Sequence, residues 1–106
     1  MVRIWRQGDV IVREVSEIPS NTVRSETDEI RISSETGHAH VLKGGRVFVS
    51  KNLRDSQLLG QQQQHYVILE GPSQMVHPQH GALQLSRGMY RVTTVRDYAP
   101  ARRFLD

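Results

Sequence analysis

The sequence predicts an all-β fold, either a small single-domain β-barrel or a β-sandwich of about eight short antiparallel strands. Apolar and polar residues alternate in several short runs, as in EIRIS (29–33), and a period of two is typical of half-buried strands. Glycine or proline separates most of these runs, which indicates turns between them. The runs recur about every 8–12 residues, a spacing typical of sandwiches and barrels.

The first half of the chain predicts strands on both sides of glycine turns. VRIW (2–5) and DVIVREV (9–15) flank a Gln-Gly pair, which is typical of a turn or bulge. EIPSN (17–21) is predicted to be a loop because of Pro19, and the polar stretch 22–29 follows it. HAHVL (38–42) lies between a Thr-Gly and a Gly-Gly pair, and RVFVS (46–50) is rich in β-branched and aromatic residues.

The second half predicts a central strand and a long final one. HYVILE (65–70) is the most apolar run, which favours an interior position. QMVH (74–77) and GALQLS (81–86) are shorter candidates, and MYRVTTVRDY (89–98) alternates over its whole length. Residues 52–64 favour either a loop or one helical turn. Pro100 lies where a short C-terminal helix could begin.

Length and composition predict one β domain spanning residues 1–106. This length suits a single hydrophobic core, and 37% of the residues are hydrophobic. No apolar run approaches the roughly 20 residues that cross a bilayer, and the N-terminus lacks the apolar core of a signal peptide. The chain has no cysteine, which excludes disulfides and thiolate ligands. We therefore expect a cytoplasmic protein that makes no contact with membranes.

The charge pattern gives weak support for a nucleic-acid surface. The formal charge is +3, and all but two of the fourteen basic residues are arginine. They are interleaved with eleven acidic residues along most of the chain. A locally basic end supplies the candidate contacts to phosphate, namely Arg91, Arg96, Arg102 and Arg103.

Two pairs of histidines suggest a metal site. His38 and His40 are two residues apart, so on a strand both side chains project to the same side, with Cα atoms roughly 6.5–7 Å apart. His77 and His80 are three apart, a spacing that converges only if the chain turns at HPQHG. Four imidazole ligands suit a divalent transition metal, with zinc as the first candidate and iron, manganese or nickel as alternatives.

A structural role for the same histidines stays open, because histidines beside glycine and proline are frequent in exposed turns. Either pair alone is weak support, and it is their co-occurrence at strand–turn boundaries that favours a site. His65 is a lesser candidate for a ligand and is more typical of a structural residue. Glu35 is a candidate for a carboxylate ligand or, together with Glu70, for accepting a hydrogen bond from the second N–H of a ligand imidazole.

The motifs resemble those of a group of small bacterial and phage-type proteins without assigned function. QGDVIV, TGHAHVL and HPQHGALQLSRGMYRVTTVRDYAP match that group in order over most of the chain, with 50–64 least covered. This chain has Ser86-Arg87-Gly88 where the group tends to have Pro-Pro-Gly, and Asp97 where it tends to have Glu. The resemblance implies that the four histidines form one constellation, and it implies no reaction.

A looser likeness is to cupin-type β-barrels, whose first motif has His-x-His and whose second adds another histidine. That first motif normally has a glutamate a few residues later, where this chain has Val41, Leu42, Lys43 and Gly44.

Three functions are compatible with these observations. The first is a small metal-binding β-domain, with a catalytic metal centre if one coordination position stays open. The second is a non-enzymatic interaction module, such as a phage structural or accessory protein, that forms homo-oligomers or binds a protein partner through strand edges. The third is a nucleic-acid binder that uses the arginines. Whether the protein is an enzyme is left open, and no residue is assigned a catalytic role.

Overall fold

The computed structural model describes residues 3–33, 37–50 and 64–95. Within these ranges the chain forms β-strands and no helix, so nothing there could span a bilayer as a helix. In chain order the strands are β1 (Ile4–Gln7), β2 (Val10–Glu14), β3 (Thr22–Arg24), β4 (Glu29–Ser33), β5 (Ala39–Lys43), β6 (Gly45–Ser50), β7 (His65–Leu69), β8 (Ser73–Val76), β9 (Leu83–Leu85) and β10 (Gly88–Thr94).

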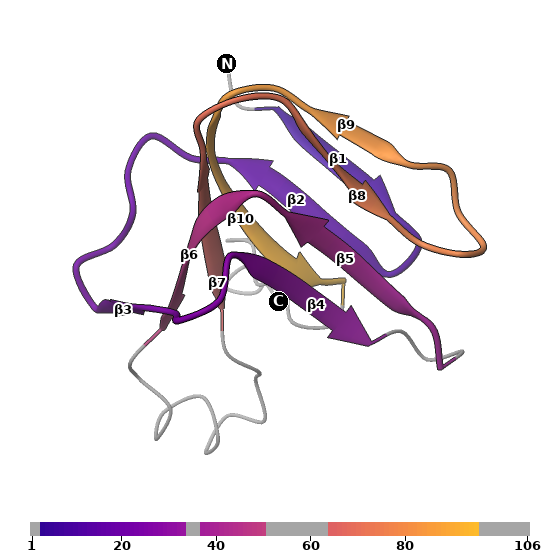
Figure 1. The fold of residues 1–106 in the computed structure, drawn as a ribbon, viewed down its shortest axis with the longest axis horizontal. Helices are drawn as coiled ribbons and strands as arrows, with labels where there is room; N and C mark the ends of the chain where they lie inside the picture. The colour runs from indigo at the N-terminus through magenta and orange to yellow at the C-terminus, as the bar shows by residue number, and fades with distance from the viewer. Residues whose placement is uncertain (1–2, 34–36, 51–63, 96–106) are drawn as a thin grey trace, which may run out of the picture.

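The strands form two antiparallel sheets that pack face to face (Figure 1). The larger sheet has the order β1-β2-β10-β7-β6-β3, and the smaller has the order β4-β5-β8-β9. Neither sheet closes on itself, so of the two predicted architectures the sandwich is the one found. The all-β prediction is confirmed, and β7 lies inside the larger sheet as its apolar sequence predicts. The predicted C-terminal helix and the segment 52–64 lie outside the described residues.

One strand was not predicted. Residues Thr22–Arg24 form β3, which pairs with β6 at the edge of the larger sheet. The sequence TVR is short, and its side chains are half-buried or exposed. It therefore lacks the alternation of apolar and polar residues from which a strand could be predicted. Backbone hydrogen bonds to β6 are sufficient to order such an edge strand.

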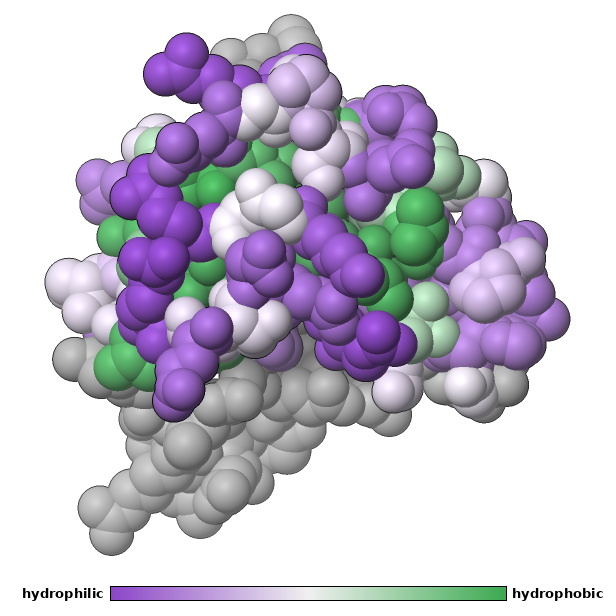
Figure 2. Space-filling view, viewed as in Figure 1, coloured by the Kyte–Doolittle hydropathy of each residue, from purple (hydrophilic) through white to green (hydrophobic). Residues whose placement is uncertain are grey.

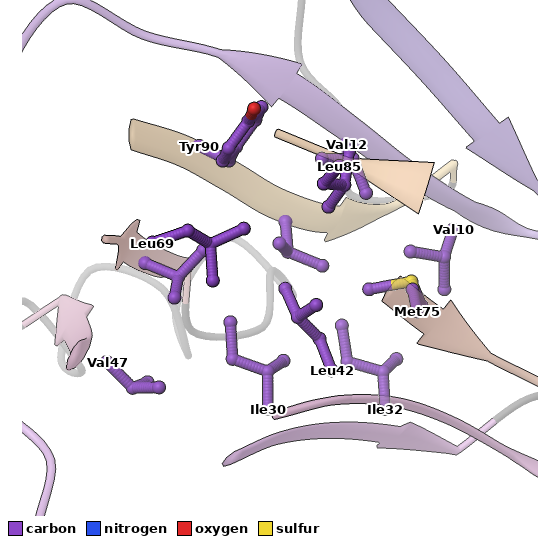
Figure 3. Packing of buried hydrophobic residues seen from close by; sticks show 12 residues of the cluster. Val10, Val12, Ile30, Ile32, Leu42, Val47, Leu69, Met75, Leu85 and Tyr90 are labelled. Carbon is purple, nitrogen blue, oxygen red and sulfur yellow. The ribbon is translucent and has the colours of Figure 1, made fainter. Parts of the chain in front are cut away.

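The core lies between the sheets and uses the inward face of almost every strand. Figure 3 shows these side chains pointing into the space between the two layers. Trp5 packs edge-on against the ring of Tyr90, with centroids 5.7 Å apart, and the Tyr90 hydroxyl donates to the Ser86 carbonyl. The buried apolar side chains are Val10, Val12, Ile30, Ile32, Leu42, Val47, Val67, Leu69, Met75, Leu85, Tyr90 and Val92.

The outward positions give a mixed surface. Hydrophilic residues cover much of the face seen in Figure 2, with hydrophobic side chains between them. Ile4 and Val23 are about half exposed on the edge strands of the larger sheet. This alternation is what a two-layer sandwich with one buried face per sheet requires.

Replacing Gly45 by alanine is expected to destabilise the sandwich. A Cβ at Gly45 would overlap Val67 and lie 2.9 Å from the carbonyl oxygen of Ile68. We expect Gly45→Ala to lower the free energy of unfolding by about 1–3 kcal/mol, because the neighbours are backbone and a buried valine. Gly71→Ala is the control, since nothing lies within 4 Å of its added Cβ. Urea denaturation measures both, and equal midpoints would contradict the packing described.

Candidate functional site

The four predicted histidines meet at one end of the smaller sheet. β5 and β8 pair with Val41 opposite Val76 and Leu42 opposite Met75. One step further in the same register places His40 beside His77, and their ring centroids are 4.3 Å apart. His80 follows in the turn after β8, with its ring centroid 4.6 Å from that of His77. His38 precedes β5, and its ring lies 5.9 Å from His77. These four residues are called the histidine cluster below.

The histidine cluster runs from the core to the surface. His40 and Leu42 share the inward face of β5, and His40 is fully buried. His77 is 7% exposed. His38 and His80 are exposed. The cluster therefore has a buried floor and a solvent-facing rim.

Gln7 determines how His40 is oriented. This side chain ends β1 and is 3% exposed. Its Nε2 donates to the carbonyl oxygens of Met75 and Gly81, both at 2.9 Å, so its Oε1 is the atom that lies 2.9 Å from Nδ1 of His40. An amide oxygen only accepts hydrogen bonds. Nδ1 of His40 must therefore hold a proton and donate it.

Asp9 lies at the other nitrogen of the same ring. Its Oδ1 is 2.9 Å from Nε2 of His40, and its side chain is 36% exposed. Asp9 is placed there by the β1–β2 turn, in which Gly8 has a φ of +58°. A Cβ at Gly8 would also lie only 2.6 Å from Nε2 of His80. The left-handed backbone conformation favours glycine at this position, and a larger residue would also displace the exposed His80 ring.

His77 has one nitrogen paired and one buried without a partner. The backbone N–H of Gln79 donates to Nδ1 of His77 at 3.0 Å. Nε2 is buried and has no hydrogen-bond partner in the part of the chain that the structure describes. Burial lowers the pKa of His77, and positive charge on His40, His80 or His38 lowers it further, while Asp9 opposes this. The fold therefore favours a neutral His77.

The side chains are close together but not arranged around a common point. Within residues 3–33, 37–50 and 64–95, no three histidine, aspartate or glutamate side chains have a geometry ready to hold a metal ion. Hydrogen bonds account for this, because both nitrogens of His40 and Nδ1 of His77 are engaged with protein atoms. The cluster brings several potential metal ligands close together. To bind an ion, they would have to exchange some of these hydrogen bonds for bonds to the metal.

The other predicted residues that the structure describes do not join the cluster. Glu70 forms an ion pair with Arg46 at 2.9 Å and precedes β8, whereas His77 follows that strand. His65 lies in β7, and burial lowers its pKa. Glu35 lies outside the described residues. Among the predicted phosphate contacts, Arg91 lies in β10 opposite Arg13, while Arg96, Arg102 and Arg103 are also outside the described residues.

A surface groove is present elsewhere on the molecule. It has a volume of about 540 Å³ and lies where residues 13–17 pass Gly88 and Met89. No histidine lines it. The clustered ionisable side chains and this groove are therefore separate features of the surface.

Sequence reasoning missed Gln7 and Asp9 as members of the site. It interpreted Gln-Gly-Asp as a turn or bulge and did not connect these residues to the histidines. The one sequence feature that could have indicated their role is that both are polar and flank Gly8 between two apolar strands.

Gln7→Leu is expected to destabilise the domain strongly. The change leaves the carbonyls of Met75 and Gly81 and the Nδ1–H of His40 without their buried partner, at a combined cost of about 2–4 kcal/mol. Gln74→Leu is the matched control, because the hydrogen bond that Gln74 accepts from Gln84 is exposed. Its effect is expected to stay within about 0.5 kcal/mol. Denaturant unfolding of both variants tests this, and a Gln7 effect no larger than the control would refute the bridging role.

Stability is expected to fall as the solution is acidified through the histidine range. Because the pKa of His77 is lowered from its ordinary 6.5 in the folded state, the unfolded chain takes up a proton first. The stabilisation is complete above pH 6.5 and is lost as the pH falls from there to the lowered pKa. His65 acts in the same direction. Unfolding free energies measured between pH 7.5 and 5 check the sign, and a flatter profile is expected for His77→Gln.

Comparison with known proteins gives one match. Neither curated proteins nor solved structures show a match to this chain. The family described as "Domain of unknown function (DUF8820)" matches residues 6–95. The matched range includes Gln7, Asp9 and the whole histidine cluster, and it covers well over half of the sequence. The chain therefore belongs to the DUF8820 family.

Proposed function

We propose that this domain binds a divalent transition-metal ion through the histidine cluster. The observation that supports this best is the proximity of four imidazoles from β5, its preceding turn and the turn after β8. In four of the ring pairs the centroids are 4.3–6.1 Å apart. Imidazole nitrogen is a preferred ligand of zinc, iron and nickel. Zinc is the first candidate, and iron, manganese and nickel are the alternatives.

The hydrogen-bond pattern of His40 supports the proposal. Metal-ligating histidines almost always donate their second N–H to a protein oxygen, which fixes the tautomer and the ring orientation. His40 meets this requirement, because its Nδ1 donates to the immobilised Oε1 of Gln7.

The unpartnered nitrogen of His77 gives independent support. A buried polar atom without a partner costs about 1–3 kcal/mol, and Nε2 of His77 is such an atom within the described residues. A metal ion bound at Nε2 would remove this cost. If the cluster had only a structural role, no contact among the described residues would offset the cost of burying this nitrogen.

Binding at His77 would require a local rearrangement. A neutral imidazole holds one proton, and Nδ1 of His77 accepts from Gln79, so the proton is on Nε2. Nε2 must lose this proton to bind a metal ion. The neutral ring would then carry its proton on Nδ1, and the bond from Gln79 would break. We therefore expect the turn at residues 77–80 to shift when metal binds.

The number of protein ligands decides what the ion could do. Four histidine ligands would close the coordination shell and make the ion structural. Three would leave a position for water at the exposed rim, where the ion could activate it for hydrolysis. The two alternative functions, a protein-interaction module and a nucleic-acid binder, stay predictions.

Elemental analysis of tag-free protein after incubation with each metal and desalting tests the proposal. We expect near one equivalent of ion, and thermal unfolding that shifts downward when chelator removes it. An ion at 100 times its dissociation constant stabilises the fold by about 2.7 kcal/mol. The variant His38→Ala/His80→Ala changes only exposed side chains, so it should fold normally and lose the ion.

His65→Ala is the control, because His65 is a histidine outside the cluster. It is expected to retain the ion. The proposal fails if the wild-type protein takes up none of the four metals and its unfolding is unaffected by chelator.

A further inference from the structure

The hydrogen bonds of His40 determine which of its two nitrogens a metal ion could use. Gln7 is held by two carbonyl oxygens, so its own oxygen faces Nδ1 of His40. Rotating the amide would place an NH₂ group against those carbonyls and lose both bonds. Nδ1 therefore stays protonated, and an ion bound by His40 must be bound at Nε2.

Nε2 of His40 points at Asp9. The two atoms, Nε2 and Oδ1, are 2.9 Å apart. A metal–nitrogen bond is about 2.0–2.1 Å long, and a metal–carboxylate bond is about 2.0–2.2 Å. The carboxylate oxygen only accepts, so Nε2 donates in this hydrogen bond, and an ion can bind there only when that proton is released to solvent. The ion would then take the place of the proton between Nε2 and the carboxylate, and Asp9 would move outward to reach bonding distance.

The number of donors indicates the size of the coordination shell. The four imidazoles of the histidine cluster and the Asp9 carboxylate are five donor groups. Five donors exceed the tetrahedral shell of structural zinc, and one water ligand would make six.

Asp9 is free to take this role. In the described part of the chain its carboxylate forms an ion pair only with His40, and no arginine or lysine competes for it. The turn that holds it also touches the ring of His80, through Gly8. Asp9 and the exposed end of the histidine cluster therefore border the same space.

We propose that Asp9 is a ligand of the ion, so that the site combines imidazoles with one carboxylate, has five or six ligands and retains exchangeable water. This inference rests on the proposed function. The carboxylate would offset one of the two positive charges of the ion. Such a nitrogen–oxygen donor set suits iron(II), manganese(II), cobalt(II) and zinc(II), and disfavours copper(I), which prefers sulfur ligands.

Cobalt(II) is the probe, because its visible absorption is weak with six ligands, intermediate with five and intense with four. The protein is titrated with cobalt(II) as wild type, Asp9→Asn and the control Asp28→Asn, which changes an exposed aspartate outside the site. We expect wild type and control to bind with the weaker bands. Asp9→Asn should bind roughly 10–100-fold more weakly and show a changed spectrum.

The outcomes separate the two proposals. Cobalt binding that is equally tight in Asp9→Asn, with an unchanged spectrum, overturns the role of Asp9 and leaves the histidine site standing. Absence of cobalt binding to the wild type overturns both.

A measurement on the wild type covers the case in which Asp9→Asn does not fold. The carboxyl ¹³C resonance of Asp9 is followed by NMR during zinc addition. A shift at one equivalent is expected, and an unchanged resonance in a zinc-loaded protein overturns the assignment.

Discussion

The three hydrogen bonds of the Gln7 side chain connect the two sheets at the end where the histidines lie. Gln7 belongs to the larger sheet, while Met75 and His40 belong to the smaller one, and Gly81 lies in the turn that leaves it. One amide thus satisfies two backbone carbonyls and one imidazole in a space where water is largely excluded. The three hydrogen bonds of the Gln7 amide fix the orientation of the His40 ring. The ring orientation in turn directs Nε2 of His40 toward Asp9.

Local patterns were enough to predict most of the fold. Alternation in EIRIS places Ile30 and Ile32 in the core, and the apolar run HYVILE forms an interior strand. The turn at HPQHG similarly brings the ring of His80 close to that of His77. These successes depend on residues two to four apart, for which backbone geometry alone decides the outcome.

Long-range contacts were beyond such reasoning. Gln7 meets partners 68 and 74 residues away, and nothing in the turn sequence identifies them. The pairing of β5 with β8, which sets His40 beside His77, likewise depends on tertiary packing rather than on spacing. Strand β3 was not predicted for a different reason. It has only three residues and no buried apolar face, and its pairing with β6 stabilises it.

The position of Gln7 near the start of the chain has a consequence for folding. Its carbonyl partners come from residues 75 and 81, so the cluster can assemble only after most of the domain has been synthesised and both sheets have docked. Contacts of such high sequence separation form late, because the entropy of closing the loop must be overcome before they contribute. In a nascent chain the pair His38 and His40 is thus separated from the pair His77 and His80 until the sandwich is nearly complete.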